Sequence, residues 1–259
     1  MTRRGCVAMT ALMALMTLTG LRPALASPVE IHPAGPSVPA NLLRFELRFD
    51  PPERQPFDVE RLTLLDGDGH EIPHALLDAA LPDTDGRRIT VLLDPGRVKT
   101  GVGPNLHAGR ALQEGATVSL RVAGRERDAA PVVKTWRVTA AAVQPLQPAL
   151  WRLTAPRRGT RDALTVDLRT PISSAGERLI AVVDARGRRV DGSTALSDGD
   201  TTWRFRPSRP WATGLHRLVT HPSLEDPAGN RRCAPFEAPR LSAVACEAAS
   251  LEFTPKGAS

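Results

Sequence analysis

Proline limits the secondary structure that this chain can adopt. The sequence has 24 prolines among its 259 residues, spread along its length. Proline lacks a backbone N–H and disrupts the preceding helical turn, so a long helical bundle or a coiled coil is excluded. Because 41% of the residues are hydrophobic, the chain can bury a core, and a disordered polymer is excluded as well. A prior of about 150 residues per domain predicts one or two domains.

The apolar residues of this chain recur at every second position rather than at the spacing of a helix. In residues 43–49, leucine or phenylalanine alternates strictly with arginine or glutamate, which predicts a half-buried strand with its charges on the other face. Further apolar stretches are 62–65, 88–93, 117–122 and 136–138, with Pro, Gly and Asp turns between them. This spacing is typical of an all-β sandwich or barrel. We expect at most a short helical turn over residues 74–80.

The second half of the chain repeats the first. Residues 163–168 match 44–49 at an offset of 119, and residues 203–205 match 89–91 at an offset of 114. The offset then falls to 98, where Leu218 matches Leu120. We therefore expect two β-sandwich domains, 27–143 and 144–259, the first carrying an insertion of about 15 residues within a long loop at 94–113.

The first 26 residues predict an export signal. Arg3 and Arg4 precede an uncharged apolar run that ends at Ala24-Leu25-Ala26, a small-x-small cleavage pattern. Cleavage after Ala26 would leave 31 basic and 28 acidic residues, a net charge of +3. We expect a periplasmic or secreted protein with no membrane span in its mature chain. An uncleaved N-terminal anchor is the alternative.

Residues 224–230 read Leu-Glu-Asp-Pro-Ala-Gly-Asn. Pro227 presets φ for a turn, Gly229 or Asn230 tolerates the left-handed conformation that ends it, and Asp226 can cap its own backbone. This corner resembles the D-x-A-G-N corner of bacterial Ig-like domains of the S-layer type. The resemblance implies two tandem Ig-like β-sandwich domains in a secreted bacterial protein. The first unit lacks the Gly-Asn pair.

Two cysteines follow the export signal, Cys233 and Cys246. An even number of cysteines in an exported protein suggests a disulfide. Two free thiols or a bridge between molecules are the alternatives.

His70-Glu71-Ile72-Pro73-His74 matches the H-E-x-x-H pattern of zinc hydrolases. That chemistry needs a helix, and Pro73 disfavours one. Asp66, Asp68 and His70 suggest a calcium loop, but the sixth and twelfth positions are Glu71 and Leu77 rather than Gly and Glu. We therefore predict a turn here and assign no catalytic residue, metal site or cofactor.

The candidate binding surface comes from the long loop and one aromatic side chain. Its members are Arg97, Lys99, Asn105, His107, Arg110 and Trp211. Long loops within compact domains are often functional, although a passive loop covering a sheet edge is the alternative.

These observations predict a non-enzymatic binding or spacer module of the cell envelope. Its partner would be a protein or glycan, and nucleic acid is not expected because charges of both signs are interspersed. A zinc hydrolase using His70, Glu71 and His74, and a glycan- or peptide-binding module, are the alternatives.

Overall fold

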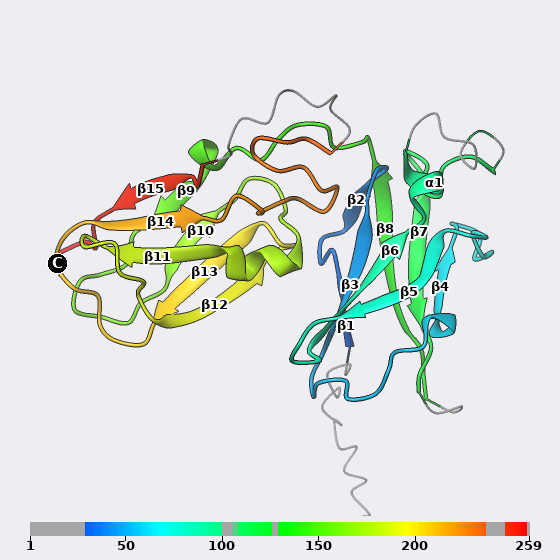
Figure 1. The fold of residues 1–259 in the computed structure, drawn as a ribbon, viewed down its shortest axis with the longest axis horizontal. Coiled ribbons are helices and arrows are strands. Elements are labelled where there is room, and N and C mark those ends of the chain that lie inside the picture. The colour runs from blue at the N-terminus through cyan, green and yellow to red at the C-terminus, as the bar shows by residue number, and fades with distance from the viewer. Residues whose placement is uncertain (1–28, 100–105, 107, 126–128, 237–246, 258–259) are drawn as a thin grey trace, which may run out of the picture.

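A computed structural model describes residues 29–99, 106, 108–125, 129–236 and 247–257 (Figure 1). The described chain is an all-β protein with four sheets that form two β-sandwiches. The predicted fold class is confirmed. The export signal lies outside the described residues.

The first sandwich packs two four-stranded sheets, β1-β3-β6-β5 and β2-β8-β7-β4. All its pairings are antiparallel except β2 with β8, which is parallel. The strands are β1 (Val29–His32), β2 (Ser37–Pro39), β3 (Arg44–Phe49), β4 (Leu62–Leu65), β5 (Leu76–Pro82), β6 (Arg88–Leu93), β7 (Thr117–Val122) and β8 (Val132–Thr139).

The second sandwich packs the sheets β12-β13-β10-β9 and β11-β14-β15. This is the four-plus-three strand arrangement of a constant-type Ig domain. The strands are β9 (Arg152–Thr154), β10 (Leu164–Asp167), β11 (Ile180–Asp184), β12 (Gly192–Ser197), β13 (Thr202–Pro207), β14 (His216–Thr220) and β15 (Ser250–Phe253).

The two sandwiches share one topology apart from β2, which has no counterpart in the second unit, and this confirms the internal repeat. β6 and β13 begin 114 residues apart, at positions 88 and 202, whereas β7 and β14 begin 99 residues apart, at 117 and 216. The difference of 15 residues agrees with the insertion predicted in the first unit. A second insertion was not predicted: it separates β14 from β15, between residues 220 and 250.

The helical elements are short: η1 (Val59–Arg61), α1 (Pro95–Val98), η2 (Pro148–Leu150) and η3 (Ser174–Leu179). Leu106 and Ala108, in the long loop of the first unit, are helical as well. The helical turn expected over 74–80 is wrong, because His74 has a φ of 51° and β5 begins at Leu76. No helix of the described chain has the length and apolarity needed to cross a bilayer.

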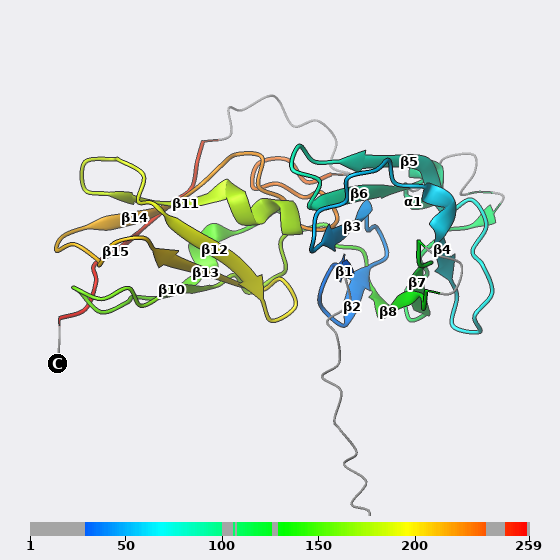
Figure 2. The ribbon, with the colours of Figure 1, turned by 90° about the horizontal axis from the view of Figure 1, so that it is seen from below.

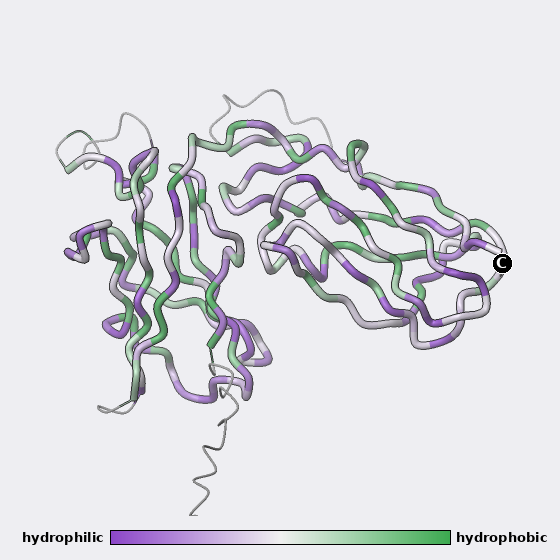
Figure 3. The backbone as a smooth tube through the Cα atoms, turned by 180° about the vertical axis from the view of Figure 1, so that it is seen from behind, coloured by the Kyte–Doolittle hydropathy of each residue, from purple (hydrophilic) through white to green (hydrophobic). Residues whose placement is uncertain are grey.

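Each sandwich has its own hydrophobic core. One cluster runs from Val29 to Val138 and contains Phe45 stacked on Trp136, with 5.2 Å between ring centroids. The other runs from Leu146 to Phe253. Figure 3 shows hydrophobic and hydrophilic segments alternating along the strands of both units. This alternation is what a strand with one buried face requires.

Candidate functional site

The H-E-x-x-H residues lie on a hairpin instead of a helix. Asp66 and Gly69 close a turn after β4, and Glu71 forms an isolated antiparallel bridge with Leu65. Neither Glu71 nor His74 belongs to a metal-competent group of three among the described residues. The geometry that a zinc hydrolase needs is therefore not formed by this segment.

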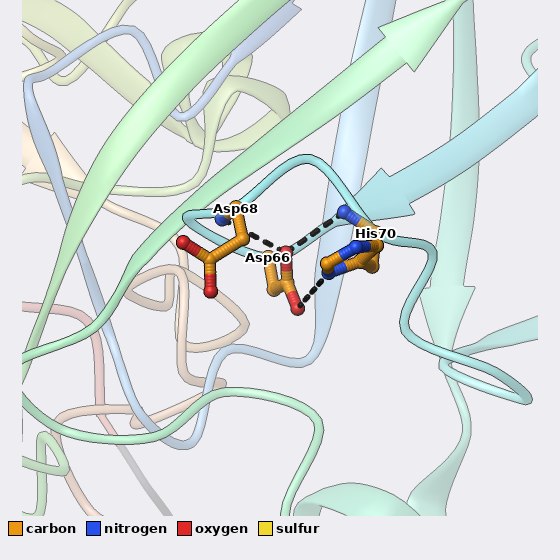
Figure 4. A group of neighbouring side chains, drawn as sticks. All are labelled: Asp66, Asp68 and His70. Atoms are coloured by element: carbon orange, nitrogen blue, oxygen red, sulfur yellow. Dashed lines mark hydrogen bonds and ion pairs between the residues drawn. The ribbon is translucent and has the colours of Figure 1, made fainter.

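Asp66, Asp68 and His70 do lie close together, with ligand atoms within 4.8 Å of one another (Figure 4). One carboxylate oxygen of Asp66 accepts the backbone N–H groups of Asp68 at 3.0 Å and His70 at 2.9 Å. These bonds lower the pKa of Asp66, the bond from His70 being the largest cause. The cluster is thus an Asx-stabilised turn, as predicted.

The long loop of the first unit is partly built into the fold. Arg97 is buried, and its guanidinium donates to the carbonyl oxygens of Gly109 and Pro73. The Lys99 ammonium lies 5.6 Å from the ring centroid of Phe236, and Arg110 is half-buried. Asn105 and His107 lie outside the described residues.

Trp211 belongs to the second hydrophobic core. Its side chain is 3% exposed, and its indole N–H donates to the carbonyl of Asp162 at 2.8 Å. It packs edge-on against Phe205, His216 and Phe253. The ring cannot stack on a ligand without displacing these neighbours. The structure therefore gives Trp211 a packing role, and only a small part of this predicted binding residue lines a surface hollow. The predicted partner of Cys233, Cys246, lies outside the described residues.

The main feature missed by the sequence analysis is a polar junction between the two sandwiches. We define it by residues 30–48 and 142 of the first unit and residues 173–177, 199–200 and 225–230 of the second. Strand β3 was expected to carry its charges on an open face. Glu46 is instead only 4% exposed, because loops of the second sandwich cover this face.

Glu46 is held by donors from the turn before β11. The Ser173 hydroxyl donates to one carboxylate oxygen at 2.7 Å, and the Ser174 hydroxyl and the Ala175 N–H, the latter at 3.0 Å, donate to the other. On either side of Glu46, Arg44 pairs with Glu225, and Arg48 pairs with Glu177 at 3.2 Å. Buried carboxylates are tolerated when they are paired and hydrogen-bonded in this way.

His32 forms the second contact of the junction. Its Nδ1 lies 3.1 Å from a carboxylate oxygen of Asp200, and Glu30 lies 3.5 Å from its Nε2. Burial alone would lower the pKa of His32, but the two carboxylates outweigh burial and raise the pKa to about 9. The hydrogen bond to His32 lowers the pKa of Glu30. His32 is therefore a buried cation at neutral pH.

The Asp226–Asn230 corner forms the third contact. Asn230 donates its backbone N–H to Asp226 at 2.8 Å and its side-chain amide to the carbonyl of Ala142 at 2.7 Å. Burial raises the pKa of Asp226. Gly229 has a φ of 80°, and a Cβ there would lie 2.5 Å from a methyl of Leu43. The predicted left-handed turn is confirmed, and it serves the junction.

The junction brings serine, histidine and aspartate together, but not as a nucleophilic site. The hydroxyls of Ser173 and Ser174 donate to Glu46, and His32 faces Asp200. The hollow between these residues is about 10 Å³, close to the space that one water occupies. A substrate has no room there, so the arrangement favours a structural role.

One sequence signal could have revealed the junction. Alternation assigns residues to faces but does not say what covers the polar face. The cue was the motif at 226–230, which predicted a tight turn; the structure shows that this turn packs closely against Leu43 of the first unit.

No family model and no curated protein matches the sequence. Among solved structures, the N-terminal Ig1-2 module of the Drosophila receptor tyrosine phosphatase DLAR is 16% identical, covers 77% of this chain and 93% of that chain, and has a TM-score of 0.24. Domains 5–6 of the S-layer protein SbsC are 12% identical to this chain, and the match covers 88% of this chain and 97% of that chain with a TM-score of 0.25. These likenesses say nothing about function, and the assignment of two tandem Ig-like β-sandwiches rests on the strand order described above.

Proposed function

We propose that this chain is a non-enzymatic, exported module of the cell envelope, with Ig-like domains 27–143 and 144–259 held in a fixed arrangement. Its role is to present its free ends to a partner at a set distance and angle. The observation that supports this proposal is the buried polar junction. A flexible linker between independent domains would not need a buried carboxylate and a buried histidine on facing surfaces.

The loops used by the junction strengthen this argument. They connect β10 with β11, β12 with β13, and β14 with β15, and all lie at one end of the second sandwich. In antibody variable domains, loops at this end contact the antigen. Here they are occupied by the first sandwich (Figure 2), so partner binding is left to other surfaces.

Small-angle X-ray scattering tests the fixed arrangement. Protein lacking residues 1–26 should scatter as one rigid particle at pH 7. The substitution Glu46→Arg places a cation beside Arg44 and Arg48, so we expect a broader distribution of maximum dimension. Glu60→Arg, an exposed position on the first sandwich, is the matched control. Wild-type scattering that requires freely reorienting domains would overturn the proposal.

Two further measurements test the other two parts of the proposal, export and the lack of enzymatic activity. N-terminal sequencing of the protein from envelope fractions should begin at Ser27, and an intact residue 1 in the cytoplasm would contradict export. The purified protein should not hydrolyse a panel of peptides and esters. Hydrolysis that disappears in His74→Ala would establish the hydrolase alternative instead.

A further inference from the structure

The free end of the second sandwich brings together four segments that are distant in sequence. The Arg158 N–H donates to the carbonyl of Lys256 at 2.8 Å, and the Gly159 N–H donates to that of Trp211 at 3.0 Å. The Ser208 N–H donates to the carbonyl of Asp191 at 2.8 Å. We call the segments 155–163, 184–191, 207–215 and 254–257 the distal tip. It lies away from the first unit, near the C-terminus (Figure 1).

The net positive charge of the chain is concentrated at the distal tip. Its basic residues are Arg157, Arg158, Arg161, Arg186, Arg188, Arg189, Arg209 and Lys256. Its acidic residues are Asp162, Asp184 and Asp191, so eight cations and three anions give a charge of +5. Without the predicted export signal the chain has 31 basic and 28 acidic residues, a net charge of +3, so the residues outside the distal tip sum to −2. The mixed charge seen along the sequence therefore separates in space.

Most of these cations are not neutralised by the fold. Arg157 pairs with Asp162 at 2.7 Å, and Arg188 pairs with Asp184 at 2.9 Å. Of the eight cations, which all belong to the described chain, five form no ion pair or side-chain hydrogen bond, and all five are exposed: Arg158, Arg186, Arg189, Arg209 and Lys256. Unpaired like charges held at one end of a rigid domain attract anions and raise their local concentration.

The distal tip is also hollowed. A depression of about 480 Å³ lies between the loops, which is within the range of small-ligand sites. Its lining includes three cations (Arg188, Arg189 and Arg209), the carboxylates of Asp184 and Asp191, of which Asp184 is paired with Arg188, and apolar surface from Val190, Pro210 and Trp211. A ligand that fits must offer anionic groups, hydroxyl donors and an apolar face together.

We infer that the distal tip binds an acidic polysaccharide, an inference that rests on the proposed function and names its partner. Uronic acid units carry carboxylates for arginine, hydroxyls that donate to Asp191, and C–H faces for Val190 and Pro210. Arginine forms bidentate hydrogen bonds with such carboxylates. The spread of cations around the hollow suits a chain that continues beyond it.

The same observations disfavour nucleic acid. Proteins that bind single strands stack bases on exposed aromatic side chains. Within the described distal tip the one aromatic residue is Trp211, and it is 3% exposed. Duplex recognition uses a helix or β-ribbon that protrudes into a groove, whereas the distal tip is concave.

Binding of polygalacturonate oligomers, measured by isothermal titration calorimetry, tests the inference. The variant Arg186→Gln/Arg189→Gln/Arg209→Gln removes three exposed cations from the distal tip. The matched control, Arg54→Gln/Arg121→Gln/Arg137→Gln, removes three exposed cations from the first sandwich. Circular dichroism and melting curves verify that both variants fold. Duplex DNA, anionic phospholipid vesicles and neutral dextran serve as comparison ligands.

We expect binding that weakens with salt, a loss of about tenfold or more in the distal-tip variant, and a change within about twofold in the control. Absence of binding, equal losses in both variants, or binding to DNA or vesicles as tight as to polygalacturonate would overturn the inference. The proposed function fails separately: domains that reorient freely in scattering can still bind polygalacturonate, and a rigid particle can fail to bind it.

Discussion

Protonation of His32 should set the pH range in which the junction is stable. The pKa of His32 is raised from 6.5 to about 9 in the folded protein. A raised pKa stabilises the folded state fully below the unfolded value of 6.5, and the stabilisation is lost as pH rises through about 9. At about 1.4 kcal/mol per pH unit, the loss amounts to about 3 kcal/mol.

The perturbation is His32→Gln, which removes the charge and keeps a donor for Asp200. Urea unfolding monitored by tryptophan fluorescence should show the wild type losing about 3 kcal/mol between pH 6 and pH 10. The variant should lose much less over this range, and it should resemble the deprotonated wild type at pH 10. His70→Gln, at the exposed hairpin, is the matched control.

Nuclear magnetic resonance of the imidazole carbons of His32 measures the pKa directly. A titration midpoint at or below 6.5 would refute the reasoning, because the carboxylates of Asp200 and Glu30 would then fail to outweigh burial. A wild type and a His32→Gln variant with parallel stability profiles would refute it as well. Arg44 and Glu46 also line the small hollow beside His32. Glu46→Gln should therefore be titrated in parallel.

Three other predictions concern single contacts. Glu46→Ala leaves Ser173 and Ser174 without their acceptor, so we expect a loss of about 1–3 kcal/mol in urea unfolding, and an unchanged midpoint would contradict the junction. Gly229→Ala places a Cβ at a φ of 80° and close to Leu43, so we expect the melting temperature of the protein to fall. The control Gly69→Ala, at a φ of 84° with no atom within 4 Å, should lower the melting temperature less. Trp211→Ala should cost about 3–5 kcal/mol in thermal unfolding, and a near-neutral result would indicate an exposed ring.

The strands were predictable because each needs only local information. Residues 43–49 alternate perfectly, and the structure forms β3 over Arg44–Phe49. The repeat was predictable for a similar reason, since matching strands keep similar spacing. Segment 76–82 was harder, because β5 has a mixed burial pattern with no clear alternation and a register shift against β6.

The junction and the distal tip were not predictable from spacing. His32 and Asp200 are separated by 168 positions, and Glu46 and Ser173 by 127. These contacts depend on how the two domains dock. Docking leaves no periodic pattern in a single sequence, so the spacing of residues could not predict it. The distal tip is missed for the same reason: its arginines come from separate loops, and each loop alone is an ordinary mixed-charge turn.

The insertion between β14 and β15 has a consequence for the architecture of any longer array. It folds back so that its Asp226–Asn230 corner caps the preceding domain, and the duplicated halves are no longer interchangeable. If the second sandwich preceded the first, Glu46 and Asp200 would face water, and the Asp226–Asn230 corner would have no surface to pack against. The two halves therefore have a fixed order, because each has one of the two complementary surfaces of the junction.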